Sequence, residues 1–318
     1  MAVGRDTIGW IGAGRMGSAM AARLVRHGCD VAVYNRTASK VDPLVAEGAT
    51  AVRTIAELSA CRIVFVNVAS SDDLLAVLDG DAGLLRQESA PAIVVDCSTV
   101  SVEASARARS LATERSAAFL AAPVSGNDKV AKAGRLMFAV SGSLEAFGEA
   151  EEYLAVMGAG ATYVGEGEVA RLVKLCHNLM LGVVIQSLFE ITALAEKGGV
   201  RRQDFLAFLN DSVMGSAFTR YKTPALVNLD FTPTFTVELL RKDFDLGLAA
   251  GRANDVPMPV AALVHQLVSA GIGAGLGDKD FAALFELEAR AAGLELKSED
   301  ADVSDGLDGN TPVGAAAG

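Results

Sequence analysis

The first half of the chain alternates short apolar runs with amphipathic segments. Compact runs rich in β-branched residues predict strands at residues 7–11, 30–34, 63–68 and 93–96. Apolar residues recur at helical spacing between these runs, over residues 40–47, 71–78 and 102–114. Because the strand runs are continuously apolar, they predict a parallel sheet covered by helices on both faces. Three later runs, at residues 119–122, 136–140 and 162–164, are expected to extend this sheet.

A long helical segment follows the last predicted strand. Residues 168–197 contain one glycine, Gly182, and no proline. At about 1.5 Å per residue, such a helix is roughly 45 Å long and can run from one domain into another. Gly198 and Gly199 are expected to end it.

The remainder of the chain keeps helical spacing up to Ala292. Its breaks are prolines, at Pro224, Pro233, Pro257 and Pro259. Residues 297–318 have no apolar periodicity and are rich in Ser, Asp, Gly and Ala, so we expect them to form a disordered tail.

A glycine-rich turn follows the first predicted strand. Residues 12–17 fit the pattern G-x-G-x-x-G, with a strand ending at Ile11 and a helix beginning at about Arg15. In that setting the first glycine permits the turn, the second lets a pyrophosphate approach the backbone, and the third lets the helix pack on the strand. The helix N-terminus offers free N–H groups to the phosphates. The predicted dinucleotide-binding residues are Gly12, Ala13, Gly14, Arg15, Met16 and Gly17.

The end of the second strand bears on the choice of cofactor. An Asp or Glu there would accept a hydrogen bond from the ribose 2′-hydroxyl of NAD and would repel a 2′-phosphate. This chain has Asn35, Arg36 and Thr37 instead, with Lys40 one turn further on. Arg36 can pair with a 2′-phosphate, and the others can donate hydrogen bonds. The pattern favours NADP(H), and NAD(H) stays possible.

Three polar residues share one side of the long helix. Lys174, His177 and Asn178 lie at positions i, i+3 and i+4 within an otherwise apolar segment. Desolvation lowers the pKa of a lysine toward neutrality, which suits a general acid or base. The alternative from these residues alone is a lysine that reaches solvent beside a hydrogen-bonded core amide.

Composition narrows the class of protein. The 318 residues carry a net charge of −11, which argues against nucleic acid as the main partner, although a small anion needs only a local positive pocket. The most apolar stretch, residues 175–189, contains His177, Asn178 and Gln186 and is expected to be too short and too polar to span a membrane. Four scattered cysteines and the lack of a secretory signal pattern favour the cytoplasm.

Four segments in order resemble motifs of the β-hydroxyacid dehydrogenase family, which includes 3-hydroxyisobutyrate dehydrogenase and tartronate, glyoxylate and succinic semialdehyde reductases. The similarity covers residues 7 to about 290. The matching segments are the glycine turn, residues 122–126 with Ala131, Gly134 and Leu136, residues 174–178, and residues 242–246. The resemblance implies an α/β Rossmann-like N-terminal domain joined by a long helix to an all-α C-terminal domain, in agreement with the patterns above.

We place the dinucleotide-binding domain at residues 1–165 and the all-α domain at residues 166–296. The all-α domain, for substrate binding and oligomerisation, begins with the long helix at residues 167–197. The tail occupies residues 297–318.

The resemblance also implies roles for particular residues. Lys174 would exchange a proton with the substrate oxygen as hydride moves between the substrate carbon and the nicotinamide, and Asn178 would orient the lysine or the reacting oxygen. The implied substrate-binding residues, which hold a small carboxylate, are Ser125, Gly126, Asn127 and Lys242. Further implied cofactor contacts are Val68, Ala69, Thr99 and Lys242. Members of the family are commonly homodimers or homotetramers, and no metal is implied.

The chain departs from the family pattern near the implied substrate. The family usually has a second glycine where this chain has Asn127, and it commonly has glycine at Val130 and Glu168. Asp128 and Lys129 add charges beside the carboxylate site. These departures leave the reaction type standing and put the identity of the substrate in doubt.

Two other functions stay open. An imine reductase would share the architecture and the preference for NADP, but such enzymes usually lack a lysine at the position of Lys174. A non-catalytic dinucleotide-binding module is the second, and the joint presence of Lys174, Asn178, Ser125 and Lys242 argues against it. A 6-phosphogluconate dehydrogenase is disfavoured because its C-terminal domain is much larger.

Overall fold

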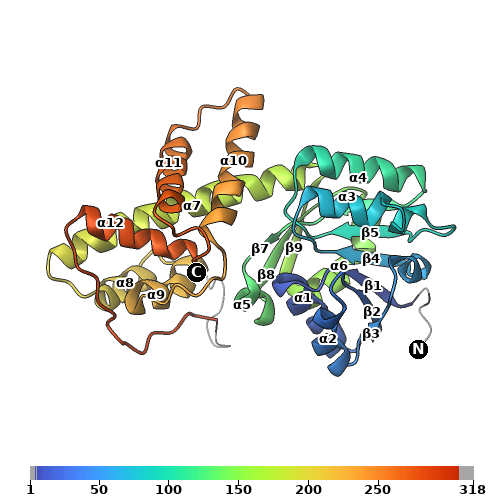
Figure 1. Cartoon of the computed structure of the whole chain (residues 1–318), viewed down its shortest axis with the longest axis horizontal. Helices are drawn as coiled ribbons and strands as arrows, with labels where there is room; N and C mark the ends of the chain where they lie inside the picture. The colour runs from blue at the N-terminus through green and yellow to red at the C-terminus, as the bar shows by residue number, and fades with distance from the viewer. Residues whose placement is uncertain (1–3, 5, 308–318) are drawn as a thin grey trace, which may run out of the picture. The chain divides into compact units, whose positions relative to one another are not determined.

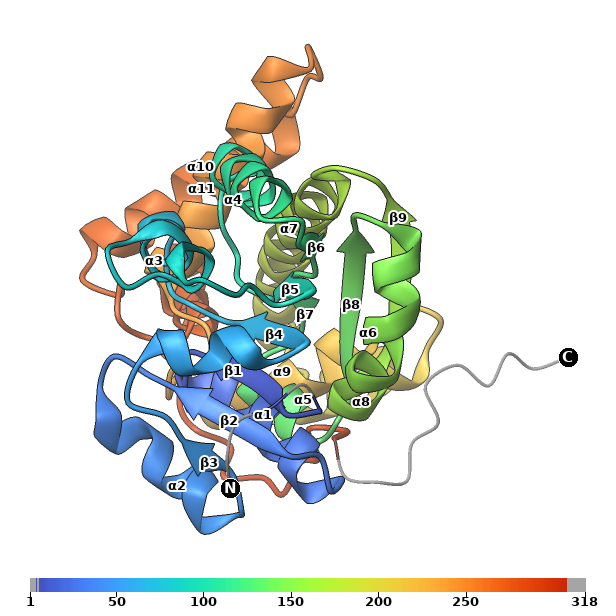
Figure 2. The ribbon, with the colours of Figure 1, turned by 90° about the vertical axis from the view of Figure 1, so that its right-hand side faces the viewer.

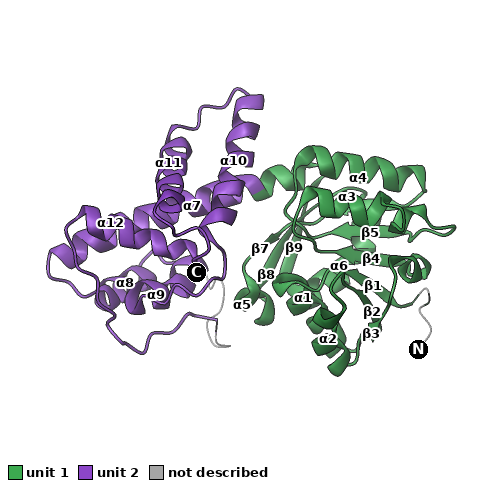
Figure 3. Ribbon diagram, viewed as in Figure 1, with its two compact units in different colours: residues 1–174 green, residues 175–318 purple. Residues whose placement is uncertain are grey.

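The computed structural model describes residue 4 and residues 6–307. Contacts between Cα atoms divide the chain into two compact units, Met1–Lys174 and Leu175–Gly318 (Figure 3). The division therefore falls inside the long helix, nine residues after the domain boundary placed at residue 165.

The first unit is built on a mixed β-sheet (Figure 1). The strands found in the described part of the chain are β1 (Ile8–Ile11), β2 (Val31–Tyr34), β3 (Thr50–Ala51), β4 (Ile63–Val66), β5 (Ile93–Asp96), β6 (Ala118–Ala121), β7 (Val124–Ser125), β8 (Leu136–Ser141) and β9 (Gly158–Gly165). Their order is β3-β2-β1-β4-β5-β6-β8-β7, with β9 beside β8. The pairs from β3 to β6 are parallel, in the 3-2-1-4-5-6 order of a doubly wound sheet, whereas β8 runs antiparallel to β6 and β7.

Helices cover this sheet on both faces, as the continuously apolar strands predict. They are α1 (Arg15–Arg26), α2 (Asp42–Ala46), α3 (Ser71–Asp79), α4 (Val102–Glu114), α5 (Asp128–Lys132) and α6 (Leu144–Met157). Helices α3 and α4 pack against each other, and α1 contacts α2, α5 and α6 (Figure 2). Crossovers that leave β1 in opposite directions put their helices on opposite faces, because each crossover is right-handed. The order of the strands therefore reverses between β1 and β4.

The second unit is helical in its described part. Besides the C-terminal part of α7 (Val169–Lys197), it contains α8 (Arg202–Asp211), α9 (Ala217–Asn228), α10 (Val237–Ala253), α11 (Pro259–Gly273) and α12 (Phe285–Ala291). Buried aromatic residues, among them Phe189, Phe244 and Phe285, form its core. Close packing of α7 on α10 depends on two glycines. A Cβ at Gly182 would lie 2.2 Å from the Phe244 ring, and one at Gly247 would lie 2.6 Å from Leu179.

Helix α7 bears on the expectation about membranes. Its 29 residues have a mean hydropathy of 1.6 over an 18-residue window, so by length and composition it is able to cross a bilayer. The expectation concerned residues 175–189 alone, and the helix extends beyond them at both ends. Half of the apolar window is buried inside the structure, as in the core helix of a globular protein.

The predicted tail is ordered over its first part. Residues 297–307 have no helix or strand, but the Glu299 carboxylate accepts hydrogen bonds from the backbone N–H groups of Arg202 and Gln203 at 2.8 and 2.9 Å. The Asn228 side chain and the Ala301 backbone also bond to each other, at 2.9 and 3.0 Å. The prediction of disorder was wrong for these residues, because polar side chains of the helical unit hold a segment that lacks apolar periodicity. Residues 308–318 lie outside the described residues.

Candidate active site

The turn between β1 and α1 has the shape of a phosphate-binding loop. Gly12 has a φ of 101°, and a Cβ there would lie 2.1 Å from the Asn67 carbonyl oxygen, so only glycine fits. A Cβ at Gly17 would lie 2.1 Å from the Gly12 carbonyl oxygen. Gly14 differs, because a Cβ there would meet no atom within 4 Å. This open backbone, at a helix N-terminus that no side chain caps, fits the pyrophosphate of a dinucleotide.

The residues of the turn also differ in how far they are exposed to solvent. Gly12, Ala13 and Gly17 are buried, Met16 is half-buried, and Gly14 and Arg15 are exposed. The Asn35 side chain fixes the turn from the end of β2, since its Oδ1 accepts a hydrogen bond from the Ala13 N–H at 2.8 Å. Its Nδ2 donates to the Thr37 carbonyl oxygen at 2.9 Å. In this structure Asn35 therefore shapes the loop.

Positive charge lies at the end of β2. The Arg36 side chain is 85% exposed, and its Nη1 lies 3.0 Å from Asp73 Oδ1 on α3. Thr37 and Lys40 are exposed as well. An exposed pair of this kind is weak in water, so Arg36 can turn toward a phosphate at small cost.

The loops after β4 and β5 are joined by hydrogen bonds. The backbone N–H of Val68 donates to Ser98 Oγ at 2.9 Å, and Asn67 Nδ2 donates to the Cys97 carbonyl oxygen at 3.2 Å. The loop after β4 lies where the sheet order reverses, between β1 and β4, which is where open α/β sheets bind ligands, and the loop after β5 lies beside it. Val68 and Thr99 are half-buried there, and Ala69 is exposed.

The predicted carboxylate-binding segment lies between β7 and α5. Ser125 ends β7 and is half-buried. A Cβ at Gly126 would lie 2.7 Å from Leu136 and Val130, so a side chain does not fit. Asn127 caps α5, because its Oδ1 accepts from the Val130 N–H at 3.0 Å. The departure from glycine at Asn127 thus has a local structural reason.

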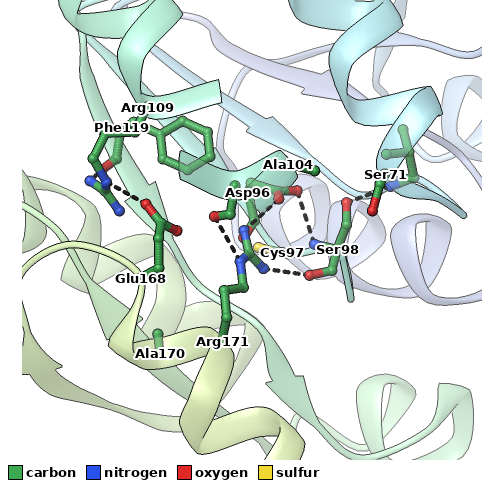
Figure 4. A network of polar contacts seen from close by, with 12 residues as sticks. Ser71, Asp96, Cys97, Ser98, Ala104, Arg109, Phe119, Glu168, Ala170 and Arg171 are labelled. Carbon is green, nitrogen blue, oxygen red and sulfur yellow. Dashed lines mark hydrogen bonds and ion pairs between the residues drawn. The ribbon is translucent and has the colours of Figure 1, made fainter. Parts of the chain in front are cut away.

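The start of α7 is fixed to the β5 loop by a buried ion pair (Figure 4). Arg171 Nη2 lies 2.5 Å from Asp96 Oδ2, and the two side chains are 1% and 0% exposed. Burial raises the pKa of Asp96, and Arg171 and Ser98 oppose that rise. Lys174, three residues later, is half-buried. Sequence reasoning missed Arg171, although a second charged residue in the same apolar run was a usable signal.

In the second unit, Asn178 is held by Asp243 of α10. Asn178 Nδ2 donates to Asp243 Oδ2 at 2.5 Å, and both residues are buried. Asn178 Oδ1 lies 2.9 Å from Nδ1 of the exposed His177. The amide that was expected to orient the lysine or the substrate is thus itself oriented by Asp243, for which the sequence motif gave no role. Lys242 is half-buried.

Neither a metal-binding group nor a reactive thiol is found among the buried residues that the structure describes. No group of three or more His, Cys, Asp or Glu side chains there is arranged to hold a metal ion. Burial raises the pKa of Cys61 to about 11 and raises that of Cys97 further. Both thiols are therefore protonated at neutral pH and poor nucleophiles.

Two family models match adjoining parts of the chain. Residues 7–165 match the NAD binding domain of 6-phosphogluconate dehydrogenase. Residues 165–287 match the model described as NAD-binding of NADP-dependent 3-hydroxyisobutyrate dehydrogenase.

Similar proteins cover nearly the whole chain. Glyoxylate/succinic semialdehyde reductase 1 of Arabidopsis thaliana is 32% identical over 280 residues, which are 88% of this chain and 97% of that protein. 2-(Hydroxymethyl)glutarate dehydrogenase of Eubacterium barkeri is 30% identical over 291 residues, 91% of this chain and 97% of that protein. The structure of Psf3 in complex with NADP+ and 2-OPP has a TM-score of 0.80 at 28% identity, covering 88% of this chain and 99% of Psf3.

The glycine turn, the doubly wound sheet and these matches define a nicotinamide-dependent oxidoreductase that acts on a hydroxyl or aldehyde group. The chain belongs to the β-hydroxyacid dehydrogenase family, as its four motifs predicted. A reductive aminase from Aspergillus terreus is also similar, with a TM-score of 0.57 at 22% identity, covering 89% of this chain and 99% of that one. At that identity the likeness shows the fold alone.

Proposed function

We propose that this protein is a cytoplasmic, NADP(H)-preferring reductase of a small semialdehyde or keto acid, with Lys174 as the general acid. The observation that best supports this proposal is the position of Lys174, which is half-buried on α7, one turn after the buried Arg171. The relatives named for semialdehydes and for a hydroxy acid support the substrate class.

Residues of this chain would transfer the proton and bind the substrate carboxylate. A bound NADPH supplies the hydride. In reduction, Lys174 Nζ donates a proton to the substrate oxygen as the carbonyl becomes a hydroxyl; in oxidation the neutral amine takes that proton back. Ser125 Oγ and the backbone N–H groups of Gly126 and Asn127 would bind the substrate carboxylate, since the Asn127 side chain already caps α5.

Four further residues take proposed supporting roles. Lys242 would add positive charge at the substrate carboxylate or a cofactor phosphate, and Asn178 would orient the reacting groups from its Asp243-bound position. Thr99 and Val68 would contact the cofactor from the loops after β5 and β4. The preference for NADP(H) rests on Arg36, whose exposed guanidinium pairs with Asp73 at the surface and can turn toward a 2′-phosphate.

The test is the reduction of glyoxylate and succinic semialdehyde with NADPH or NADH, monitored by the loss of nicotinamide absorbance. We expect turnover with NADPH, and turnover lower by about a thousandfold or more in Lys174→Ala, while NADPH binding persists. A third arm supplies a ketone with an amine. Reduction only in that arm would favour an imine reductase, and NADPH binding with no turnover in any arm would favour a non-catalytic module.

We also propose a homodimer or homotetramer. Large apolar side chains are exposed on the second unit, including Leu194, Phe208, Met214 and Leu263, at 63–74%. An interface between protomers would cover side chains of this kind. Sedimentation at micromolar concentration gives the mass, and a monomer there would contradict this proposal.

A further inference from the structure

Arg171 makes a fork of contacts at the start of α7 (Figure 4). Besides the ion pair with Asp96, its Nη1 donates to the Ser98 carbonyl oxygen at 2.6 Å. Its Nε donates to Ser105 Oγ on α4 at 3.0 Å. The side chain is 1% exposed, so all three contacts are shielded from water. The guanidinium therefore ties α7 at once to the β5 loop and to α4.

The same loop reaches the proposed cofactor residues. Asp96 Oδ1 accepts a hydrogen bond from the Ser98 N–H at 3.0 Å, so the carboxylate braces the loop and binds Arg171 together. Ser98 Oγ in turn accepts from the Val68 N–H at 2.9 Å. One continuous set of hydrogen bonds thus runs from the turn after β4, through the β5 loop, to α7.

A second group of contacts holds the first turn of α7. Ser141 Oγ donates to the Gly167 carbonyl oxygen at 2.7 Å and lies 3.2 Å from the Ala170 N–H, which donates to it. Arg109 pairs with Glu168 at 2.6 Å and donates to the same Gly167 carbonyl oxygen at 2.6 Å. With strand β8, helix α4 and the β5 loop all bonded to this turn, the helix cannot rotate or slide there without breaking several buried contacts.

We propose that Arg171 is a positioning residue for the reaction, one that sets where Lys174 presents its ammonium group; this role rests on the proposed function. Residues i and i+3 lie on neighbouring positions of one helix face, about 4.5 Å apart along the axis. Fixing Arg171 therefore fixes the height and direction of Lys174 relative to the β5 loop, which carries Thr99. Displacements of about 1 Å at a reacting group can cost about a hundredfold in rate.

The experiment replaces the anchor and asks whether its effect passes through the lysine. Arg171→Gln removes the charge and the fork, whereas Arg171→Lys keeps a charge for Asp96 and loses the fork geometry. The matched control is Arg202→Gln, at a second arginine that is 1% exposed, with a carboxylate partner (Glu196, 2.7 Å) and a backbone carbonyl partner (Val227, 3.0 Å), in the other unit. Circular dichroism verifies folding at the assay temperature.

We expect Arg171→Gln to lower kcat about a hundredfold with little change in the NADPH dissociation constant, and Arg171→Lys to recover part of the loss. Arg202→Gln should keep kcat within about threefold of wild type. In the Lys174→Ala background, Arg171→Gln should lower the residual rate no further, because the group that it positions is gone.

Two results with the Arg171→Gln substitution would overturn this role alone: a wild-type kcat in the folded single variant while Lys174→Ala is inactive, or the same hundredfold loss in the Lys174→Ala background. An equal loss of kcat in Arg202→Gln would also overturn it, because replacing any buried arginine would then have the same effect on kcat. Full turnover by Lys174→Ala would overturn the proposed function together with this role.

Discussion

Gly14 allows the cofactor site to be tested apart from the fold. An added methyl group at Gly14 meets no atom of the chain within 4 Å, and its φ of −73° and ψ of −176° suit alanine. Gly14→Ala should therefore be as stable as wild type, or up to about 1 kcal/mol more stable through the unfolded state. The same methyl group would occupy the space through which a pyrophosphate approaches the backbone.

The loss of cofactor affinity follows from the hydrogen bonds at stake. Pushing a phosphate off the N-terminus of α1 removes one charge-assisted hydrogen bond, worth about 1.5–3 kcal/mol. At about 1.4 kcal/mol per factor of ten, NADPH should bind on the order of 10- to 100-fold more weakly. Gly17→Ala is the contrasting variant. Its Cβ would lie 2.1 Å from the Gly12 carbonyl oxygen, so we expect about 1–3 kcal/mol of destabilisation.

The assay uses Trp10, the one tryptophan in the chain, which is fully buried and donates from Nε1 to the Gly12 carbonyl oxygen at 2.8 Å. Its fluorescence reports NADPH binding by quenching and reports unfolding in urea. Wild-type NADPH affinity in Gly14→Ala would refute the reasoning, because it would mean that no ligand approaches the open backbone of this turn. Loss of stability in that variant would refute the packing argument instead.

Three further outcomes are expected. Burial tends to raise the pKa of Asp280, but Lys222 at 2.5 Å and several hydrogen bonds hold it below its ordinary value. That contribution to stability is present above about pH 4 and is lost as the pH falls through the lower folded pKa. Asp280→Asn should lower the free energy of unfolding by about 3–5 kcal/mol at pH 7. Urea unfolding from pH 2.5 to 7 should also show a smaller loss of stability at low pH in this variant than in wild type, and an equal loss in both would contradict this. Asp243→Asn should lower kcat/KM about tenfold by releasing Asn178 in a folded protein, and an unchanged value would mean that the contact is only structural. Arg36→Gln should weaken NADPH binding about tenfold and leave NADH unaffected in parallel titrations; equal effects on both would place the phosphate contact elsewhere.

Much of the fold could be predicted because local pattern and final structure agree. The helix predicted at residues 102–114 is found with the same bounds, since Ser101 caps it by accepting from the Ala104 N–H at 3.1 Å. Four strands of the parallel part, β1, β2, β4 and β5, were each placed to within two residues at either end, because fully buried strands are continuously apolar. The tight turn at residues 12–17 was predicted because Gly12 and Gly17, which the structure requires as glycines, act within a few residues of each other.

Elements that depend on distant partners were missed. Strands β3 and β7 have two residues each, too few to show a period, and the antiparallel direction of β8 is decided by its neighbours. Helix α6 was absent from the prediction, although its buried residues Ala146, Ala150, Leu154 and Met157 recur at helical spacing. Residues 297–307 carry no helical or strand pattern and are held instead by polar contacts such as that of Glu299 with Arg202.

The same limit explains which parts of the site could be foreseen. Lys174 and the glycine turn belong to short motifs, whereas Asp96 and Arg171 are 75 residues apart and Asn178 and Asp243 are 65 apart. No local pattern records such pairs, because the strand order and the helix crossing bring them together. The sequence did contain one usable signal, which was the second positive charge, Arg171, close to Lys174. A buried arginine needs a carboxylate partner, and Asp96 is the acidic residue that ends a wholly apolar strand. On the roles proposed above, Lys174 exchanges the proton and Arg171 holds Lys174 in position.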